Sequence, residues 1–180
     1  LCVISHLASS EERDNVYNER QLEKFTKLAN KFPNAKRSLA NSSGIFLGLD
    51  YQFDLVRPGA ALYGINPSNE SMIKNPVQLF APIIQIHQLM PGESAGYNST
   101  YTNSTRNSCS IATIPIGYAD GFLRCLSNKF VFHINGHKAP IVGRVSMDLV
   151  IIDVSLVPER DLTLGQKVEV LGNNCTPDGM

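Results

Sequence analysis

Four short motifs of the sequence each place a tyrosine or an arginine beside glycine or proline. In chain order they are Asp54-Leu-Val-Arg-Pro-Gly59, Ala95-Gly-Tyr-Asn-Ser-Thr-Tyr101, Ile114-Pro-Ile-Gly-Tyr-Ala-Asp-Gly121 and Val142-Gly-Arg-Val-Ser-Met-Asp148. Glycine and proline favour tight turns, so each motif brings a polar side chain to a sharp bend of the backbone. One such motif would be an ordinary turn. Four in one chain predict a functional site.

A phosphate group could be held beside the first of these motifs. Ser42 offers a hydroxyl, and the backbone amides of Gly59 and Ala60 can point into the space that a glycine leaves open. In β/α barrels the loops after the last strands, together with the start of a short helix, commonly bind phosphate. An ordinary Asn-Ser-Ser-Gly turn is the alternative interpretation. With the companion motifs, Ser42, Gly59 and Ala60 are the predicted phosphate ligands.

Residues 1–66 have the rhythm of alternating strands and helices. Short strands are predicted over 1–4, 37–40 and 53–56, each with polar residues at its carboxyl end. A helix between the first two strands is predicted by apolar residues at helical spacing, namely Leu22, Phe25, Leu28, Ala29 and Phe32. This order is typical of a β/α (TIM-type) barrel, whose sites gather at the carboxyl ends of the strands. Three strands are too few to close a barrel, so a partial one is expected.

Residues 67–75 are rich in linker residues and are predicted to separate this domain from a β-domain over 76–180. In the second domain β-branched and aromatic runs predict strands over 82–90, 110–116, 130–134, 150–154 and 167–171. The sequence Ile134-Asn-Gly-His137 predicts a hairpin turn, since Asn-Gly accepts positive φ readily. The predicted fold class is α/β plus β, a partial barrel followed by a mainly antiparallel β-domain.

Composition excludes several classes of partner. Sixteen acidic and sixteen basic side chains balance, which gives no electrostatic case for nucleic acid or an anionic membrane. No apolar run approaches the roughly 18 residues of a membrane span, and no leader is recognisable. The four cysteines are scattered without zinc-binding spacing, so no metal is expected. We interpret each as a buried structural thiol in a protein of the reducing cytoplasm.

Taken together, the motifs resemble those of alanine racemase, the pyridoxal-phosphate-dependent family that interconverts L- and D-alanine. The resemblance runs from about Ser5 to Leu171 and implies the last three strands of that family's barrel, in its second half, and the first part of its β-domain. It also implies a cytoplasmic homodimer with composite active sites that supplies D-alanine for peptidoglycan. The cofactor would be pyridoxal 5′-phosphate.

Two pieces of the family are missing from the resemblance. The family's Schiff-base lysine lies in a Lys-Ala-Asn-Ala-Tyr-Gly-like motif, which no lysine of this chain matches. The carboxyl-terminal tyrosine that touches the cofactor phosphate has no counterpart either. The chain also opens on an apolar run without methionine and closes on a turn-forming stretch. We therefore expect a fragment of a longer protein, inactive by itself.

Racemisation needs an acid/base group on each face of the cofactor, and by resemblance Tyr97 serves one face. It would also contact the substrate, while the missing lysine would serve the other face. A phenol with a pKa of about 10 is a poor base at neutral pH, so it needs nearby cations or a proton relay. A strand tyrosine with a satisfied hydroxyl is the alternative. The family often has glycine where this chain has Asn98.

By resemblance Arg57 faces the pyridine nitrogen of the cofactor. Arginine stays protonated, so it would donate to an unprotonated ring nitrogen and make electron withdrawal into the ring less favourable. His6 matches a histidine packed near that arginine, with a purely structural histidine as the alternative. Ser38 stands where the family often has another histidine, so the polar network around Arg57 is expected to differ.

The remaining predicted site residues lie in the last two motifs or, for Arg124, shortly after the third. The backbone amide of Met147 matches one that meets the substrate carboxylate. A polar entry corridor is matched by Tyr118, Arg124, Arg144 and Asp148. A structural ion pair between Arg144 and Asp148 is the alternative for those two. Other pyridoxal-phosphate racemases or decarboxylases on the same plan, and a non-catalytic remnant, are the alternative functions.

Overall fold

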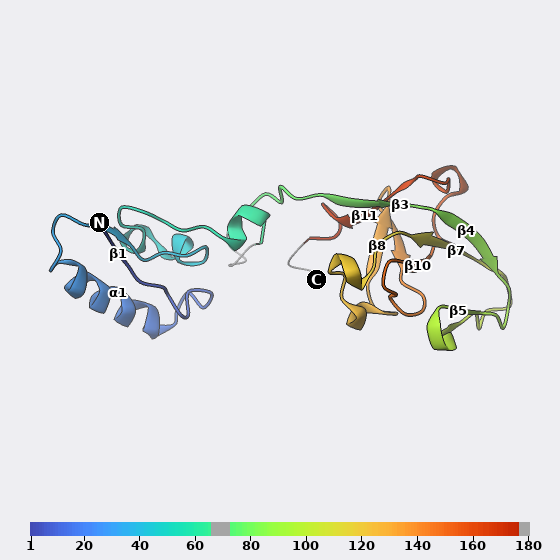
Figure 1. Ribbon diagram of the computed structural model, residues 1–180, viewed down its shortest axis with the longest axis horizontal. Helices are drawn as coiled ribbons and strands as arrows, with labels where there is room; N and C mark the ends of the chain where they lie inside the picture. Colours follow the sequence, from blue (N-terminus) through green and yellow to red (C-terminus); the bar gives the residue numbers. More distant parts are fainter. Residues whose placement is uncertain (66–72, 177–180) are drawn as a thin grey trace. The chain divides into compact units, whose positions relative to one another are not determined.

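The computed structural model describes residues 1–65 and 73–176. The chain divides into two compact units, one built from Leu1–Val77 and the other from Gln78–Cys175 (Figure 1). Most of the predicted linker, residues 67–72, lies outside the described residues. No helix in the described part of the chain is long and apolar enough to cross a membrane.

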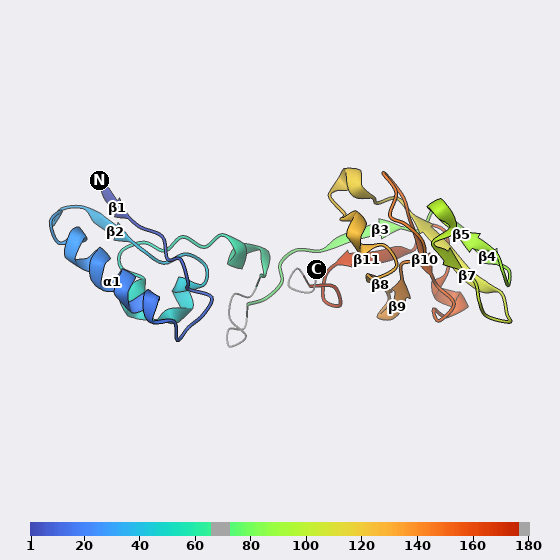
Figure 2. The ribbon, with the colours of Figure 1, turned by 90° about the horizontal axis from the view of Figure 1, so that it is seen from below.

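The first unit contains a parallel strand pair joined through a helix. Strand β1 (Cys2–Ile4) pairs in parallel with β2 (Lys36–Ser38), and helix α1 (Val16–Ala29) connects them. In both views α1 runs beside this pair (Figures 1 and 2). The helix begins after Asn15, whose side chain accepts a hydrogen bond from the amide of Tyr17 at 2.9 Å. The first two predicted strands and the helix are confirmed.

The apolar stripe of α1 is only partly covered. Phe25 and Ala29 are buried with Leu7 and Leu39 in the core of the first unit. In contrast Leu28 is 56% exposed, and Phe32 lies beyond the end of the helix. Leu28 and Phe32, whose spacing helped to predict the helix, therefore lie outside its buried face. A sheet of two strands is narrow, so it covers only the central part of the stripe.

The third predicted strand, residues 53–56, does not form. Phe53 has φ +49°, which interrupts an extended backbone. The amides of Asp54 and Leu55 both donate to the carbonyl of Arg37, and the amide of Arg57 donates to that of Ala40. The segment thus follows β2 without a regular ladder. Three short 3₁₀ turns complete the unit: η1 (Gly44–Leu47), η2 (Leu49–Tyr51) and η3 (Ala60–Tyr63).

The second unit is built from antiparallel strands, most of which are labelled in Figures 1 and 2. Its sheets have the strand orders β10-β7-β4, β3-β11-β8-β9 and β5-β6, and every pair of neighbours is antiparallel. The strands are β3 (Leu79–Pro82), β4 (Gln85–Leu89), β5 (Ser94–Ala95), β6 (Tyr101–Thr102), β7 (Cys109–Ile114), β8 (Val131–Ile134), β9 (His137–Pro140), β10 (Val150–Asp153) and β11 (Lys167–Leu171). The predicted antiparallel β-domain is confirmed at this level.

The run over 82–90 predicted as one strand is divided between two sheets. Ile83 donates its amide to the carbonyl of Gln166, next to β11, whereas the amide of Ile84 donates to Thr113 of β7. Ile83 is 1% exposed and belongs to the core shared by both sheets. The chain therefore changes sheets at a buried corner, which an apolar run does not reveal. The other four predicted strands overlap β7, β8, β10 and β11.

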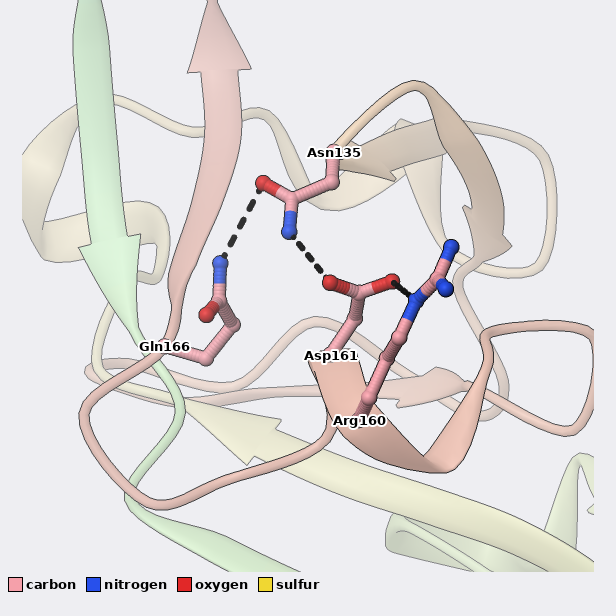
Figure 3. Close-up of polar contacts among 4 residues, drawn as sticks. All are labelled: Asn135, Arg160, Asp161 and Gln166. Atoms are coloured by element: carbon pink, nitrogen blue, oxygen red, sulfur yellow. Dashed lines mark hydrogen bonds and ion pairs between the residues drawn. The ribbon is translucent and has the colours of Figure 1, made fainter.

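The predicted hairpin turn is confirmed. Asn135 and Gly136 have φ +48° and +85°, as a tight Asn-Gly turn between β8 and β9 requires. The side chain of Asn135 donates to Asp161 at 2.8 Å and accepts from Gln166 at 3.5 Å (Figure 3). Asp161 ends the 3₁₀ turn η7 (Glu159–Asp161) and also lies 3.7 Å from Arg160. The hairpin is thus tied to the segment before β11.

The four cysteines fall into two environments. Cys109 and Cys175 are buried, whereas Cys2 and Cys125 are exposed, so the prediction that all four are buried is wrong for two. The thiol of Cys175 lies 3.2 Å from Nδ1 of His133. Burial, and then the charge of Glu169, raises the pKa of Cys175 to about 11. This thiol stays protonated at neutral pH and is a weak nucleophile.

Alkylation of the native chain with iodoacetamide at about pH 8 should modify Cys2 and Cys125 first, since their thiols are exposed to solvent. Cys109 and Cys175 should react only after unfolding in denaturant. Intact-mass and peptide mass spectrometry over time would measure both rates. Labelling of Cys175 as fast as Cys125 would contradict this placement.

Candidate active site

The second motif forms an exposed turn between β5 and β6. Tyr97 opens the 3₁₀ turn η4 (Tyr97–Ser99) and is 68% exposed, so its ring projects from the turn instead of lying in a strand. Gly96, Asn98 and Ser99 all have positive φ, at +76°, +59° and +48°. Asparagine tolerates the left-handed region better than most residues do. Asn98 therefore suits a turn position where glycine would also fit.

The fourth motif packs its backbone directly on this turn. Gly143 has φ +84°, and a Cβ placed on it would lie 2.8 Å from the carbonyl oxygen of Ala95 and 3.3 Å from Cα of Gly96. A Cβ on Gly96 would lie 3.1 Å from the amide nitrogen of Arg144. Two glycines that face each other thus allow the segments bearing Tyr97 and Arg144 to touch backbone to backbone.

The third motif is joined to the fourth in the same way. A Cβ on Gly117 would overlap the carbonyl group of Met147. This close approach lets the amides of Tyr118 and Ala119 donate to the carbonyls of Ser146 and Met147 at 3.0 and 2.9 Å. The carboxylate of Asp120 accepts from the amide of Gly117 at 2.9 Å and closes the 3₁₀ turn η5 (Tyr118–Asp120).

A pocket of about 460 Å³ opens between the second and fourth motifs. Tyr97 and Arg144 line it together, so the structure brings the predicted base and a cation to one cavity. The other lining residues are Gln85, Gly96, Thr113, Ser146, Leu149 and Ile151. Gln85 and Thr113 were missed from the sequence, since neither belongs to one of the four motifs. They are direct cross-strand partners in β4 and β7, which only the register reveals.

The other corridor residues lie outside this pocket's lining. Tyr118 and Met147 are exposed and are held beside one another by the backbone bonds between their segments. Arg124 opens the 3₁₀ turn η6 (Arg124–Leu126) and is exposed, as is Asp148. Within the described residues Arg144 and Asp148 form no ion pair. The alternative of a structural ion pair is therefore not supported.

Arg57 of the first unit is the centre of a polar cluster. Nη1 donates to Oγ of Ser38 at 2.6 Å, and Nη2 donates to the carbonyl of Ser5 at 2.7 Å. Nη2 also lies 3.5 Å from Nδ1 of His6, whose Nε2 lies 3.2 Å from the side-chain amide of Asn41. Asn41 was missed from the sequence. Ser38 is a direct hydrogen-bond partner of the guanidinium.

Ser42, Gly59 and Ala60 lie together, but not as the phosphate prediction supposed. Oγ of Ser42 accepts hydrogen bonds from the amides of Gly59 at 2.8 Å and Ala61 at 3.3 Å. The expectation that the Gly59 amide points into open space is therefore wrong. The buried hydroxyl instead satisfies amides at the start of η3, which lack partners within a short helix. The space beside Gly59 remains open, since a Cβ there would have only Oγ of Ser42 nearby, at 4.0 Å.

Comparison with known protein families agrees with this arrangement of motifs. The model of the alanine racemase N-terminal domain matches residues 1–67, and that of the alanine racemase C-terminal domain matches residues 76–179. The chain belongs to the alanine racemase family. The two domain models together cover nearly the whole chain.

Curated relatives include the alanine racemases of Rickettsia bellii and Rickettsia canadensis. The chain is 58% identical to the first over 179 residues and 57% identical to the second over 176 residues. Both alignments cover 98% of this chain, but only 43% and 48% of the relatives. The chain thus spans less than half the length of these racemases.

Solved alanine racemase structures have the same fold over this length. The Bartonella henselae enzyme, determined with covalently bound pyridoxal phosphate, matches with a TM-score of 0.87 and 41% identity. The biosynthetic enzyme of Pseudomonas aeruginosa matches with a TM-score of 0.83 and 34% identity. Each match covers 98% of this chain and 49% of the racemase.

The contact between Gly96 and Gly143 can be tested by substitution. Gly143→Ala should destabilise the second unit by roughly 1–3 kcal/mol, because it adds left-handed strain and a clash with Ala95. Gly92→Ala is the matched control, since Gly92 has φ +82° with nothing within 4 Å of its Cβ position. Urea unfolding of both variants would measure the difference. Equal losses would mean that the close approach has no energetic importance.

Proposed function

We propose that this chain is part of an alanine racemase that interconverts L- and D-alanine with pyridoxal 5′-phosphate, supplying D-alanine for peptidoglycan. The observation that carries the proposal is the shared pocket of Tyr97 and Arg144, formed by motifs of the family. A cytoplasmic location, a homodimer with composite sites, and a second-half barrel over 1–66 belong to the same proposal. So do the linker over 67–75 and the β-domain over 76–180.

Tyr97 is the proposed acid/base group at one face of the substrate. Its ring is exposed on a turn, where an amino acid can reach the hydroxyl. The guanidinium of Arg144 lines the same pocket. The backbone amide of Met147 would meet the substrate carboxylate. Tyr118, Arg124, Arg144 and Asp148 would form the polar entry corridor.

The residues of the first unit fit a bound pyridoxal phosphate in part. The guanidinium of Arg57 carries more N–H donors than its two short hydrogen bonds use, so it can also donate to the ring nitrogen. His6 and Ser38 would hold that guanidinium in place. The hydroxyl hydrogen of Ser42 and the amide of Ala60 would hold the phosphate in the open space beside Gly59, whose own amide already donates to Ser42. When bound, the cofactor supplies a sink for the electrons released with the α-proton.

The isolated chain should not racemise alanine at a measurable rate. No lysine of the chain matches the Schiff-base motif, so the covalent anchor and one of two bases would be absent. The purified chain would be assayed for D-alanine formation with added pyridoxal phosphate. Robust turnover that persists in Tyr97→Phe would overturn this proposal together with the role of Tyr97.

The role of Tyr97 can be tested in a chimera in which this chain replaces the matching part of the Rickettsia bellii racemase. Tyr97→Phe should lower the rate about a hundredfold to ten-thousandfold, because it removes one proton-transfer group and keeps the ring. Exchange of the α-hydrogen should become unequal between L- and D-alanine. Tyr101→Phe is the control, because it removes a hydroxyl from a half-buried ring at the other end of the same turn. It should leave the racemisation rate and the α-hydrogen exchange nearly normal. Equal, normal exchange in Tyr97→Phe would remove Tyr97 from the mechanism.

Arg57→Glu in the same chimera tests the residue at the ring nitrogen. A carboxylate there can share a proton with that nitrogen, which favours electron withdrawal into the ring that arginine disfavours. Racemisation should slow, and the bound cofactor should gain absorbance at longer wavelength during turnover. Arg20→Glu, on the exposed side of α1, is the control for charge reversal. If the cofactor binds but rate and spectrum stay unchanged, Arg57 does not face the ring.

A further inference from the structure

Two residues that follow η6 reach several segments of the candidate site. The hydroxyl of Ser127 donates to the carbonyl of Arg124 at 2.6 Å and accepts from the amide of Val145 at 3.0 Å. Asn128 is next in the chain and has φ +56°, a left-handed conformation that asparagine adopts more readily than most residues. Ser127 and Asn128 are not among the residues lining the pocket of Tyr97 and Arg144.

The side-chain amide of Asn128 spans the gap between the second and fourth motifs. Its Oδ1 accepts from the amide of Gly143 at 2.6 Å, next to Arg144. Its Nδ2 lies 3.4 Å from Oγ1 and 3.5 Å from the carbonyl oxygen of Thr100, the residue that caps the Tyr97 turn. The contact to Gly143 is short, whereas those to Thr100 are long and weaker.

The hydrogen bonds of Asn128 are the polar part of the contact between residues 96–100 and residues 143–144, which otherwise consists of van der Waals contact. Among the described residues no hydrogen bond joins residues 96–100 directly to residues 143–144. Gly96 and Gly143 only allow the two backbones to approach each other. Van der Waals contact limits how near the segments come but does little to stop them from sliding. The amide of Asn128, hydrogen-bonded on both sides, opposes such sliding.

We propose that Asn128 is a positioning residue that sets the separation of Tyr97 and Arg144 in their pocket. The inference rests on the proposed racemase function only for its catalytic consequence, since the geometric part concerns the chain itself. Asn128 contacts neither reacting group. It acts through Gly143 and Thr100 on the two segments that carry them, with Ser127 holding Val145 beside it.

Two substitutions test the hydrogen bonds of Asn128 to Gly143 and to Thr100 separately. Asn128→Gly keeps the left-handed backbone and removes the whole amide. Asn128→Asp keeps an acceptor for Gly143 and replaces the donor that faces Thr100 with an oxygen. The matched control is Asn135→Gly, which removes another left-handed asparagine of the same unit, with partners Asp161 and Gln166 (Figure 3). A merely structural loss should be similar at both positions.

The first measurement uses the 180-residue chain itself. Nuclear magnetic resonance should detect faster hydrogen exchange of the Gly143 amide in Asn128→Gly, by about tenfold or more, because its acceptor is gone. Nuclear Overhauser contacts between Gly96 and Gly143 should weaken. Asn128→Asp should preserve the slow exchange of Gly143, and Asn135→Gly should leave both observations unchanged. Unaltered exchange and contacts in Asn128→Gly would overturn the proposal, whatever the activity.

The second measurement uses the chimera with the Rickettsia bellii racemase. Asn128→Gly should lower kcat about tenfold to a hundredfold with little change in KM, since small displacements of a catalytic group carry such costs. The pH dependence of kcat should also move, because the distance between phenol and guanidinium changes. Asn128→Asp should recover part of the rate, and Asn135→Gly should match the parent chimera. A normal kcat and pH profile in Asn128→Gly would overturn the catalytic consequence.

The two measurements separate failure of this inference from failure of the proposed function. An unsubstituted chimera without racemase activity would count against the proposed function. The exchange of Gly143 and its contacts with Gly96 would still decide whether Asn128 holds the two segments together. The chimera could also be active and lose the same fraction of activity in Asn128→Gly as in Asn135→Gly. Asn128 would then contribute only to the general stability of the unit, and the positioning role would be overturned.

Discussion

The site in the second unit depends on backbones that touch without side chains between them. Gly143 lies against Ala95 and Gly96, and Gly117 lies against Met147, at distances that a Cβ atom would not permit. Atoms packed in this way have few alternative arrangements, because interiors tolerate neither voids nor overlaps. The three motifs of this unit therefore pack together as one rigid cluster. Their polar side chains are placed by contacts in which those side chains take no part.

The two units position an arginine side chain in different ways. Arg57 is held by its own hydrogen bonds to Ser38 and the carbonyl of Ser5, so its guanidinium is oriented directly. Arg144 is placed through its backbone, by the contact of Gly143 and the amide of Asn128. The first arrangement is rigid at the charged group, since a planar guanidinium fixes the direction of each donor. The second fixes the backbone of the residue that carries the charge.

Prediction from the sequence succeeded where a local pattern and its physical cause coincide. The hairpin at Asn135-Gly136 formed because that dipeptide accepts two positive φ angles, and four of the predicted β runs overlap strands of two sheets. Prediction failed where the conformation of a segment depends on partners that are distant in the sequence. The run over 82–90 divides at Ile83 because its two halves pair with different sheets. Residues 53–56 bend at Phe53, and the Gly59 amide is occupied by a hydroxyl 17 positions away.

What the sequence determined by itself is the set of motifs, their order and the family to which they belong. Residue types and spacing persist in the chain whether or not it is folded, and they already specify the Asn135-Gly136 turn and the runs that overlap β7, β8, β10 and β11. Only the tertiary structure decided which motifs meet. It placed Tyr97 and Arg144 in one pocket, added Gln85 and Thr113 to its wall, and revealed Asn128 between the segments. These choices depend on strand register and on the absence of single Cβ atoms, which act only after distant segments have come together.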